Sequence, residues 1–155
     1  RATDLPVVAA GGIGSGDAML AAMALGAEGV QIGTLFALSA ESSASEAFKQ
    51  RCLALDEGGT MLCLKKLSPT RLVRNGLFDK VAEAEARGAN AEELRDILGK
   101  AASKRGIFEG DTEQGELEIG QIASSVDAIR PAGEIVRQLV ENFRKAQKDV
   151  AAIGF

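Results

Sequence analysis

Two short apolar runs near the start of the chain each lead into glycine. The runs are Val7–Ala10, which precedes Gly11, and Gly29–Ile32, which precedes Gly33. A run without charged residues is typical of a parallel strand that is buried on both faces. The apolar residues of segment 15–27 predict a helix between the two strands. The pattern therefore predicts a β-α-β unit whose two glycine loops leave the same edge of one sheet.

Capping residues define the ends of the predicted helices. Ser15 caps the first helix and Gly26 ends it. Ser43 and Glu46 fit a capping box at the start of the next helix, with Ser43 as the cap. Asn90 caps a later helix. The helices predicted after the first one cover residues 46–56, 77–87 and 91–98, and a long helix begins at residue 131.

The last predicted helix begins at Pro131 and is amphipathic. Its apolar positions recur at helical spacing and predict one buried stripe: Ile135, Val136, Leu139, Val140, Phe143 and Val150. Between the helices, residues 60–64 favour a short strand, residues 69–76 a basic connector and residues 106–120 an irregular surface stretch. The chain thus changes from β-α-β at its start to mostly helical patterns over the remaining two thirds.

The composition narrows the classes of protein. The 18 Lys and Arg and the 22 Asp and Glu are interspersed, which argues against a nucleic-acid surface. No stretch reaches eighteen consecutive apolar residues, which argues against a membrane span. Cys52 and Cys63 are too few for a secreted disulfide scaffold, so we expect reduced thiols and a cytoplasmic protein. The chain has no His, which removes the commonest general acid or base and metal ligand.

Glycine crowds the first loop without completing a known nucleotide motif. Asp17 stands where a dinucleotide-binding motif needs its third glycine, and no Gly-Lys-Ser/Thr follows. Ile13 stands where a nucleophile elbow needs its first glycine. Glycine lets the backbone approach an anion closely, and Thr34 adds a hydroxyl donor in the second loop. Two such loops on adjacent parallel strands predict a phosphate site, and tight turns without a ligand are the alternative.

The spacing of these loops resembles the nitronate monooxygenase family, which includes the FMN-dependent enoyl-acyl-carrier-protein reductases. Val7–Ile13 and Ala24–Thr34 look like the last two barrel strands of that family. Arg87–Ala89, Lys104–Asp111 and Gly115–Gln121 are similar to its reductase branch, and the last segment is the most discriminating. Nucleotide-processing barrels such as inosine-monophosphate dehydrogenase use a similar pair of loops.

The resemblance implies an α/β fold: the C-terminal part of a (β/α)8 TIM barrel, with its last two strands, followed by a mostly helical small domain. We expect residues 1–67 to hold the barrel strands and the phosphate loops, and residues 68–128 to form the small domain. Residues 129–155 would be an amphipathic helix that packs back on the barrel. The 155 residues are fewer than the roughly 250 that a complete barrel needs, so we expect a fragment.

The resemblance also implies which residues hold the FMN phosphate. They belong to the two loops: Gly11, Gly12, Gln31, Ile32, Gly33 and Thr34. We expect no metal ligand among them. This chain has Leu35 where the family commonly has Arg, and Ser45 where it often has His. The catalytic His of the family follows a glycine pair on an earlier strand, outside this chain. We therefore expect the chain to be inactive by itself.

The function that the resemblance implies is that of a flavin-dependent oxidoreductase. NADH or NADPH would give hydride to FMN, which would reduce the C2–C3 double bond of an enoyl thioester on acyl-carrier protein in fatty-acid synthesis. The alternatives are a nitronate monooxygenase (2-nitropropane dioxygenase) and a non-catalytic half-barrel. The choice of reductant, the acyl-chain preference and the oligomeric state, including a homodimer, stay open.

Two groups of charged residues remain outside this scheme. The acidic group does not have EF-hand spacing and is expected to be a solvated loop: Glu109, Asp111, Glu113, Glu116 and Glu118. The basic group is expected to be a solvated face, or to meet a nucleotide phosphate or an acidic carrier protein: Lys65, Lys66, Arg71 and Arg74.

Overall fold

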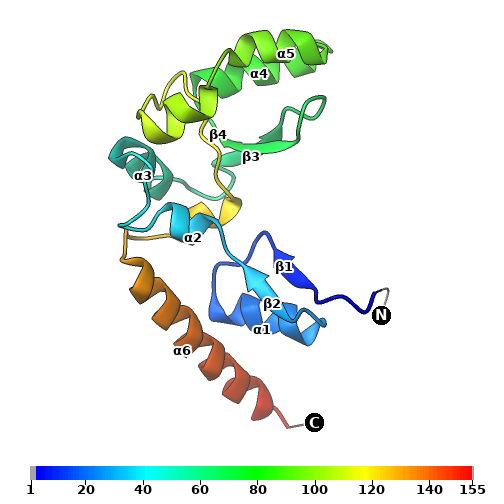
Figure 1. Cartoon of the computed structure of the whole chain (residues 1–155), viewed down its shortest axis with the longest axis vertical. Helices are drawn as coiled ribbons and strands as arrows, with labels where there is room; N and C mark the ends of the chain where they lie inside the picture. The colour runs from blue at the N-terminus through cyan, green and yellow to red at the C-terminus, as the bar shows by residue number, and fades with distance from the viewer. Residues whose placement is uncertain (1–2, 155) are drawn as a thin grey trace. The chain divides into compact units, whose positions relative to one another are not determined.

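The computed structural model describes residues 3–154, and the chain divides into two compact units. The first unit comprises Arg1–Glu41 and Ile129–Phe155, and the second comprises Ser42–Ala128. Each contains helices and one two-stranded sheet, which makes the fold α/β (Figure 1). Within residues 3–154, no helix has the length and apolar character needed to cross a membrane.

The first unit is a β-α-β unit followed by two helices. Strands β1 (Val8–Ala10) and β2 (Gly29–Gln31) are parallel neighbours, and helix α1 (Gly16–Ala24) connects them. The short helix α2 (Thr34–Ala37) follows β2 directly. The long helix α6 (Ala132–Ala151) packs against α1 and contacts α2. The predicted order of strand, glycine loop, helix, strand and glycine loop is confirmed.

Helices α1 and α6 meet at a glycine. Gly16 is buried at the start of α1, and a Cβ atom there would overlap the backbone of Asn142 and Phe143. Ser15 precedes it as the predicted cap, and its Oγ accepts a hydrogen bond of 3.1 Å from the N–H of Ala18. The absence of a side chain at position 16 therefore allows the two helix backbones to touch.

The predicted burial of the first unit is wrong in two places. Strand β1 was expected to be buried on both faces, but the side chain of Val8 is 56% exposed. Among residues 3–154, β1 has one neighbouring strand, so much of its surface stays open. The stripe on α6 is narrower than predicted, because Val136, Val140 and Val150 are exposed while Ile135 is buried.

The second unit is a hairpin packed with helices. Strands β3 (Thr60–Cys63) and β4 (Thr70–Val73) are antiparallel, and helix α3 (Glu46–Leu53) precedes them. Helices α4 (Gly76–Ala86) and α5 (Ala91–Leu98) follow and contact each other. These elements enclose a hydrophobic core of buried residues: Cys63, Leu64, Leu72, Phe78, Val81, Ala84, Ala89 and Leu94.

Two short helical turns complete the second unit. A π-helical turn, η1, covers Lys104–Phe108, and a 3-10 turn, η2, covers Gln121–Ser125. Gly106 in η1 touches Gly115, and a Cβ atom on either residue would overlap backbone atoms. The two backbone segments pass each other here so closely that neither position has room for a side chain.

The segment after Gly115 belongs to the core, whereas we predicted an irregular surface stretch over residues 106–120. The N–H of Val73 donates to the carbonyl of Leu117 at 3.0 Å, and the side chain of Leu117 is 1% exposed. The N–H of Ile119 donates to the carbonyl of Arg71 at 3.3 Å. The segment therefore runs along β4 and buries Glu116, Leu117 and Ile119, although its sequence contains many acids and glycines.

Two further details differ from the sequence-based expectations. Residues 69–76 were expected to be a connector, but β4 lies within them. Ser45, not Ser43, caps α3, because its Oγ accepts from the N–H of Phe48 at 3.2 Å. Asn90 caps α5 as predicted.

Candidate functional site

The two glycine loops leave the same edge of the β1–β2 sheet. The strands run parallel with Ala10 opposite Gln31, so Gly11 and Gly12 follow β1 at the edge where Gly33 follows β2. The sequence-predicted residues of the two loops therefore lie at neighbouring strand ends. That they bind phosphate stays a prediction.

The two loops have open space around their glycines, and the first loop has φ angles that would strain any residue other than glycine. Gly11 and Gly12 have φ angles of +88° and +70°, a region that residues with a Cβ atom rarely adopt. No heavy atom lies within 4 Å of a Cβ built on Gly11, Gly12 or Gly33. Among residues 3–154, the backbone N–H groups of Gly12, Gly33 and Thr34 find no hydrogen-bond acceptor. Unsatisfied N–H groups at adjacent strand ends are well suited to bind an anion.

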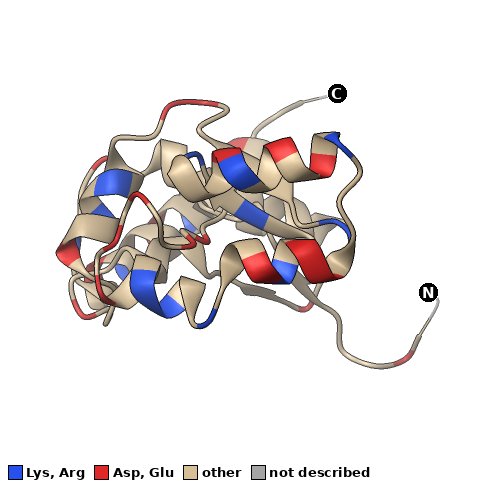
Figure 2. Cartoon of the chain, turned by 90° about the horizontal axis from the view of Figure 1, so that it is seen from above, with Lys and Arg blue, Asp and Glu red and all other residues tan. Residues whose placement is uncertain are grey.

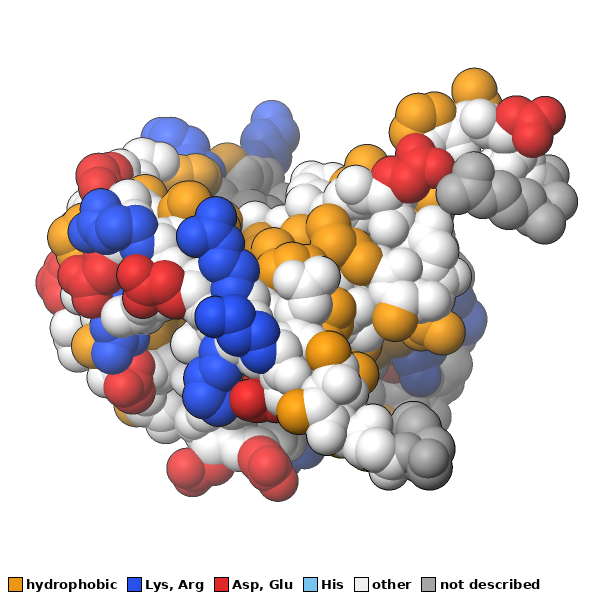
Figure 3. Space-filling model, turned by 90° about the horizontal axis from the view of Figure 1, so that it is seen from below, with side chains coloured by type: hydrophobic (Ala, Val, Ile, Leu, Met, Phe, Trp, Pro, Cys, Tyr) orange, Lys and Arg blue, Asp and Glu red, His pale blue; other side chains and the backbone are white. Residues whose placement is uncertain are grey.

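Apolar surface lies beside the first loop. A groove of about 630 Å³ runs along β1 and α1 and includes Gly11 and Gly12 in its lining. Val7 and Leu25, which also line it, are 47% and 91% exposed. Figure 3 shows hydrophobic side chains in orange on the face of the molecule that it presents. Exposed apolar surface of this kind is typical of a face that contacts another molecule or segment.

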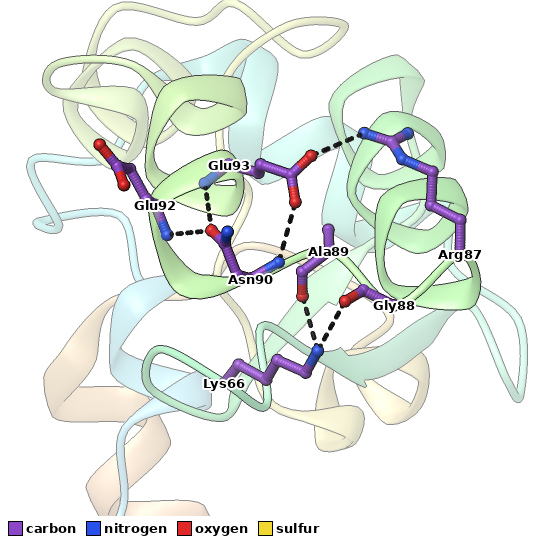
Figure 4. A network of polar contacts seen from close by, with 7 residues as sticks. All are labelled: Lys66, Arg87, Gly88, Ala89, Asn90, Glu92 and Glu93. Carbon is purple, nitrogen blue, oxygen red and sulfur yellow. Dashed lines mark hydrogen bonds and ion pairs between the residues drawn. The ribbon is translucent and has the colours of Figure 1, made fainter.

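Most of the basic group singled out in the sequence supports the second unit internally. The Nζ of Lys66 donates to the carbonyls of Gly88 and Ala89 at 2.9 and 2.7 Å, at the end of α4 (Figure 4). Beside it, Asn90 and Glu93 form a reciprocal capping box at the start of α5. Lys66 therefore joins the two helix ends, and two of its three N–H donors are used there.

Acidic and basic residues are mixed along the helices. Figure 2 shows acidic and basic residues interspersed along the helices, as the sequence predicts. Arg87 and Glu93 illustrate this, since they form an ion pair of 3.7 Å between the ends of α4 and α5. The interspersion agrees with the expectation that the chain does not bind nucleic acid, which itself stays a prediction.

The acidic group is not a solvated loop throughout, because Glu116 is buried. Its side chain lies beside Ser103, whose Oγ is 2.9 Å from Oε2 of Glu116 and 2.6 Å from Oε1 of Glu118. Burial raises the pKa of Glu116, the hydrogen bond from Ser103 lowers it, and the charge of Glu118 raises it. Since a hydroxyl has one hydrogen, both contacts are hydrogen bonds only when one carboxyl is protonated.

Neither thiol nor metal chemistry is supported by the described residues. Cys52 and Cys63 are both buried and form no disulfide. Burial raises their pKa values to about 12 and about 11, so both are protonated and unreactive near neutral pH. Within residues 3–154, no three His, Cys, Asp or Glu side chains come together as metal ligands.

Comparison with known proteins assigns the family. The family model described as nitronate monooxygenase matches residues 1–142. The nitronate monooxygenase of Neurospora crassa is 30% identical over 164 residues, which cover 97% of this chain and 41% of that protein. A Mycobacterium tuberculosis protein named (3aS,4S,5R,7aS)-5-hydroxy-7a-methyl-1-oxo-octahydro-1H-indene-4-carboxyl-CoA dehydrogenase is 30% identical over 175 residues, covering 89% of this chain and 49% of its own length.

Solved structures agree with this assignment. The structure of FabK from Thermotoga maritima matches with a TM-score of 0.89 and 33% identity, over 97% of this chain and 48% of that one. The nitroalkane oxidase of Streptomyces ansochromogenes matches with a TM-score of 0.73 and 32% identity, over 96% of this chain and 42% of that one. The chain thus spans about half the length, or less, of these relatives. On its sequence and its fold, the chain belongs to the nitronate monooxygenase family.

Proposed function

We propose that this chain supplies the phosphate-binding end of an FMN site in an oxidoreductase, an NAD(P)H-dependent enoyl-acyl-carrier-protein reductase. The observation that carries the proposal is the pair of glycine loops at one edge of the β1–β2 sheet, with unsatisfied N–H groups at Gly12, Gly33 and Thr34. The similarity to FabK supports the reductase in particular. In this proposal β1 and β2 are the last two strands of a (β/α)8 barrel.

The residues present fit a phosphate group. The N–H groups of Gly12, Gly33 and Thr34 would donate to its oxygens, with Gly11 and the backbone of Gln31 and Ile32 beside them. The open space over the glycines leaves room for the phosphate group. Position 35 is a leucine and brings no positive charge, so backbone donors would hold the phosphate. Bound FMN would supply the redox chemistry, accepting hydride from NADH or NADPH and reducing the enoyl thioester.

Binding of FMN to the purified chain tests this proposal. Titration followed by flavin fluorescence should give saturable binding of FMN and at least tenfold weaker binding of riboflavin, which lacks the phosphate. Gly12→Ala should weaken FMN binding at least tenfold, because its φ of +70° strains a residue with a Cβ atom and shifts the loop N–H groups.

Gly26→Ala is the matched control for Gly12→Ala. Gly26 also has a positive φ, +102°, and open space around it, but it follows α1 and lies outside both loops. FMN affinity within about twofold of wild type is expected for this variant, since it shares the backbone strain without the site. Equal binding of FMN and riboflavin, or equal losses in both variants, would contradict the proposal.

A nitronate monooxygenase is the second candidate, favoured by curated relatives of that name in Neurospora crassa and Pseudomonas aeruginosa. Two assays of FMN-loaded protein separate the reactions. The reductase oxidises NADH or NADPH in the presence of a crotonyl thioester, whereas the monooxygenase consumes oxygen with propionate 3-nitronate. Because the chain has no His, we expect it to be inactive by itself, so these two assays need a longer protein that also contains a catalytic His, whereas the FMN titration does not depend on turnover.

A further inference from the structure

A cavity of about 340 Å³ lies within the second unit, outside the glycine loops. It is formed where the turn before β3 meets the β3–β4 hairpin and the 3-10 turn η2. Its lining is mostly polar and comes from three separate stretches of sequence: Leu55, Asp56, Glu57, Gly58, Thr60, Arg71, Gln121, Ile122, Ser124 and Ser125. Small-ligand sites have volumes of about 300–1,000 Å³, so this cavity has room for one part of a larger ligand.

Arg71 gives this cavity an unneutralised positive charge. Its Nη1 donates to the carbonyl and the Oγ1 of Thr60 at 3.0 and 3.3 Å, which fixes the guanidinium against the hairpin. Over residues 3–154, no carboxylate lies within ion-pair distance of Arg71, whereas Arg87 and Lys104 are each paired with a glutamate. A guanidinium has five N–H donors in a planar fork, so several remain for a ligand such as phosphate.

The other polar groups of the cavity select among anions. Asp56 and Glu57 are exposed in its lining, and they would repel a bare anion next to Arg71. Carboxylates accept hydrogen bonds from sugar hydroxyls, and an arginine beside such carboxylates suits a phosphorylated ribose. The hydroxyl of Ser125 has no recorded partner within the described chain and adds a further donor.

We propose that this cavity binds the phosphorylated ribose of an adenine nucleotide, with Arg71 on the phosphate and Asp56 or Glu57 on the remaining ribose hydroxyl. NADPH, which the proposed reaction uses as reductant, and coenzyme A thioesters both carry this group. NADPH has a 2′-phosphate on its adenosine ribose, and a coenzyme A thioester has a 3′-phosphate. Only the choice between these sources rests on the proposed function, because the binding site itself is defined by the cavity.

Calorimetric titration of the chain with 2′-AMP, 3′-AMP, adenosine and inorganic phosphate tests the proposal. We expect 2′-AMP or 3′-AMP to bind at least tenfold more tightly than adenosine or inorganic phosphate. The tighter of the two identifies the source, NADPH for 2′-AMP and a coenzyme A thioester for 3′-AMP. Arg71→Gln should weaken this binding at least tenfold, and Arg71→Lys should weaken it less, since lysine keeps the charge without the fork.

Arg74→Gln is the matched control. Arg74 is an exposed arginine directly after β4, and its Nη2 contacts the Sδ of Met61, which lies outside the cavity. It should leave the affinity within twofold of wild type. If Arg71→Gln does not fold, as judged by its thermal melt, Arg71→Lys and Ser125→Ala replace it.

Binding of neither nucleotide, or equal affinities in wild type and the Arg71 variants, would overturn the proposal. The FMN proposal fails separately, because Gly12→Ala tests it in the other unit. Nucleotide binding that survives Gly12→Ala while FMN binding is lost supports both proposals.

Discussion

The two units of this chain differ in how far each covers its own apolar surface. In the second unit, Val73, Val81 and Leu94 are completely buried, and segments far apart in sequence close over them. In the first unit, Leu25 and Val8 are 91% and 56% exposed beside an apolar groove. The unit that carries the glycine loops is therefore the open one, and the unit with the closed core carries neither loop.

The difference implies that the first unit provides the proposed FMN-binding site and that the second unit provides most of the stability. A closed core provides most of the free energy of folding, because hydrophobic burial is the main favourable contribution. Exposed strand edges and apolar faces provide little of it and are prone to associate with other chains. We therefore expect the second unit to be the more stable part of the chain, and the first to gain stability when its open surface is covered.

The largest expected effect comes from emptying the closed core. Leu94→Ala should lower the free energy of unfolding of the second unit by about 3 kcal/mol, since the buried leucine leaves a cavity. Leu25→Ala, at the exposed position in the first unit, should change stability by less than about 0.5 kcal/mol. Both cysteines lie buried in the second unit, so thiol labelling in urea reports the unfolding of that unit, and circular dichroism, to which α1 and α6 contribute, reports the unfolding of the first unit. Equal effects of the two substitutions would show that the two units are packed equally well at these positions.

Helix caps provide a second, smaller comparison between the units. The Oδ1 of Asn75 accepts from the N–H of Phe78, and its Nδ2 donates to the carbonyls of Thr112 and Gly115 at 2.9 Å each. Among residues 3–154, the side chain of Ser15 makes only the cap bond, which it accepts from the N–H of Ala18.

Asn75→Ala should therefore cost about 2 kcal/mol and Ser15→Ala about 1 kcal/mol, because the first leaves two further carbonyls without a donor. Urea unfolding followed by circular dichroism measures both losses. A loss from Ser15→Ala as large as that from Asn75→Ala would mean that the extra bonds contribute nothing.

Local signals in the sequence predicted the first unit well. The β-α-β order and the cap at Ser15 follow from apolar runs, glycine and a hydroxyl residue within a few positions of each other. The membership of the family also followed from the spacing of these loops and the segment 115–121. These features depend on neighbours in sequence, which a single chain displays directly.

Burial could not be predicted where it depends on distant segments. The acids and glycines around Leu117 indicated surface, yet pairing with β4 and the crossing of Gly106 over Gly115 bury this segment. Strand β1 shows the opposite case. Its apolar run predicted burial, but among residues 3–154 it has one neighbouring strand and Val8 stays exposed. The sequence singled out Arg71 as one residue of a basic group that could meet a nucleotide phosphate, but it did not show the cavity, because the lining comes from three stretches more than ten residues apart.

The smallest expected effect is a pH dependence that comes from a buried carboxyl of the closed unit. Burial raises the pKa of Glu116 in the folded chain above the ordinary value of about 4.3 for a glutamate. The folded state therefore binds this proton more tightly than the unfolded state does. Stability from this group is present below the unfolded-state pKa and is lost as pH rises through the higher folded-state pKa.

Glu116→Gln should remove this loss, because glutamine stays neutral and can still bond to Ser103. Urea midpoints measured between pH 4 and pH 8 should thus fall less steeply for Glu116→Gln than for wild type. Glu113→Gln, an exposed acid in the same stretch, serves as the control and should keep the wild-type slope. Glu118 faces the same hydroxyl, and its charge disfavours ionisation of Glu116. If the slopes of Glu116→Gln and wild type coincide, the buried carboxyl does not couple folding to pH, and the core of the second unit is more permeable to water than its burial implies.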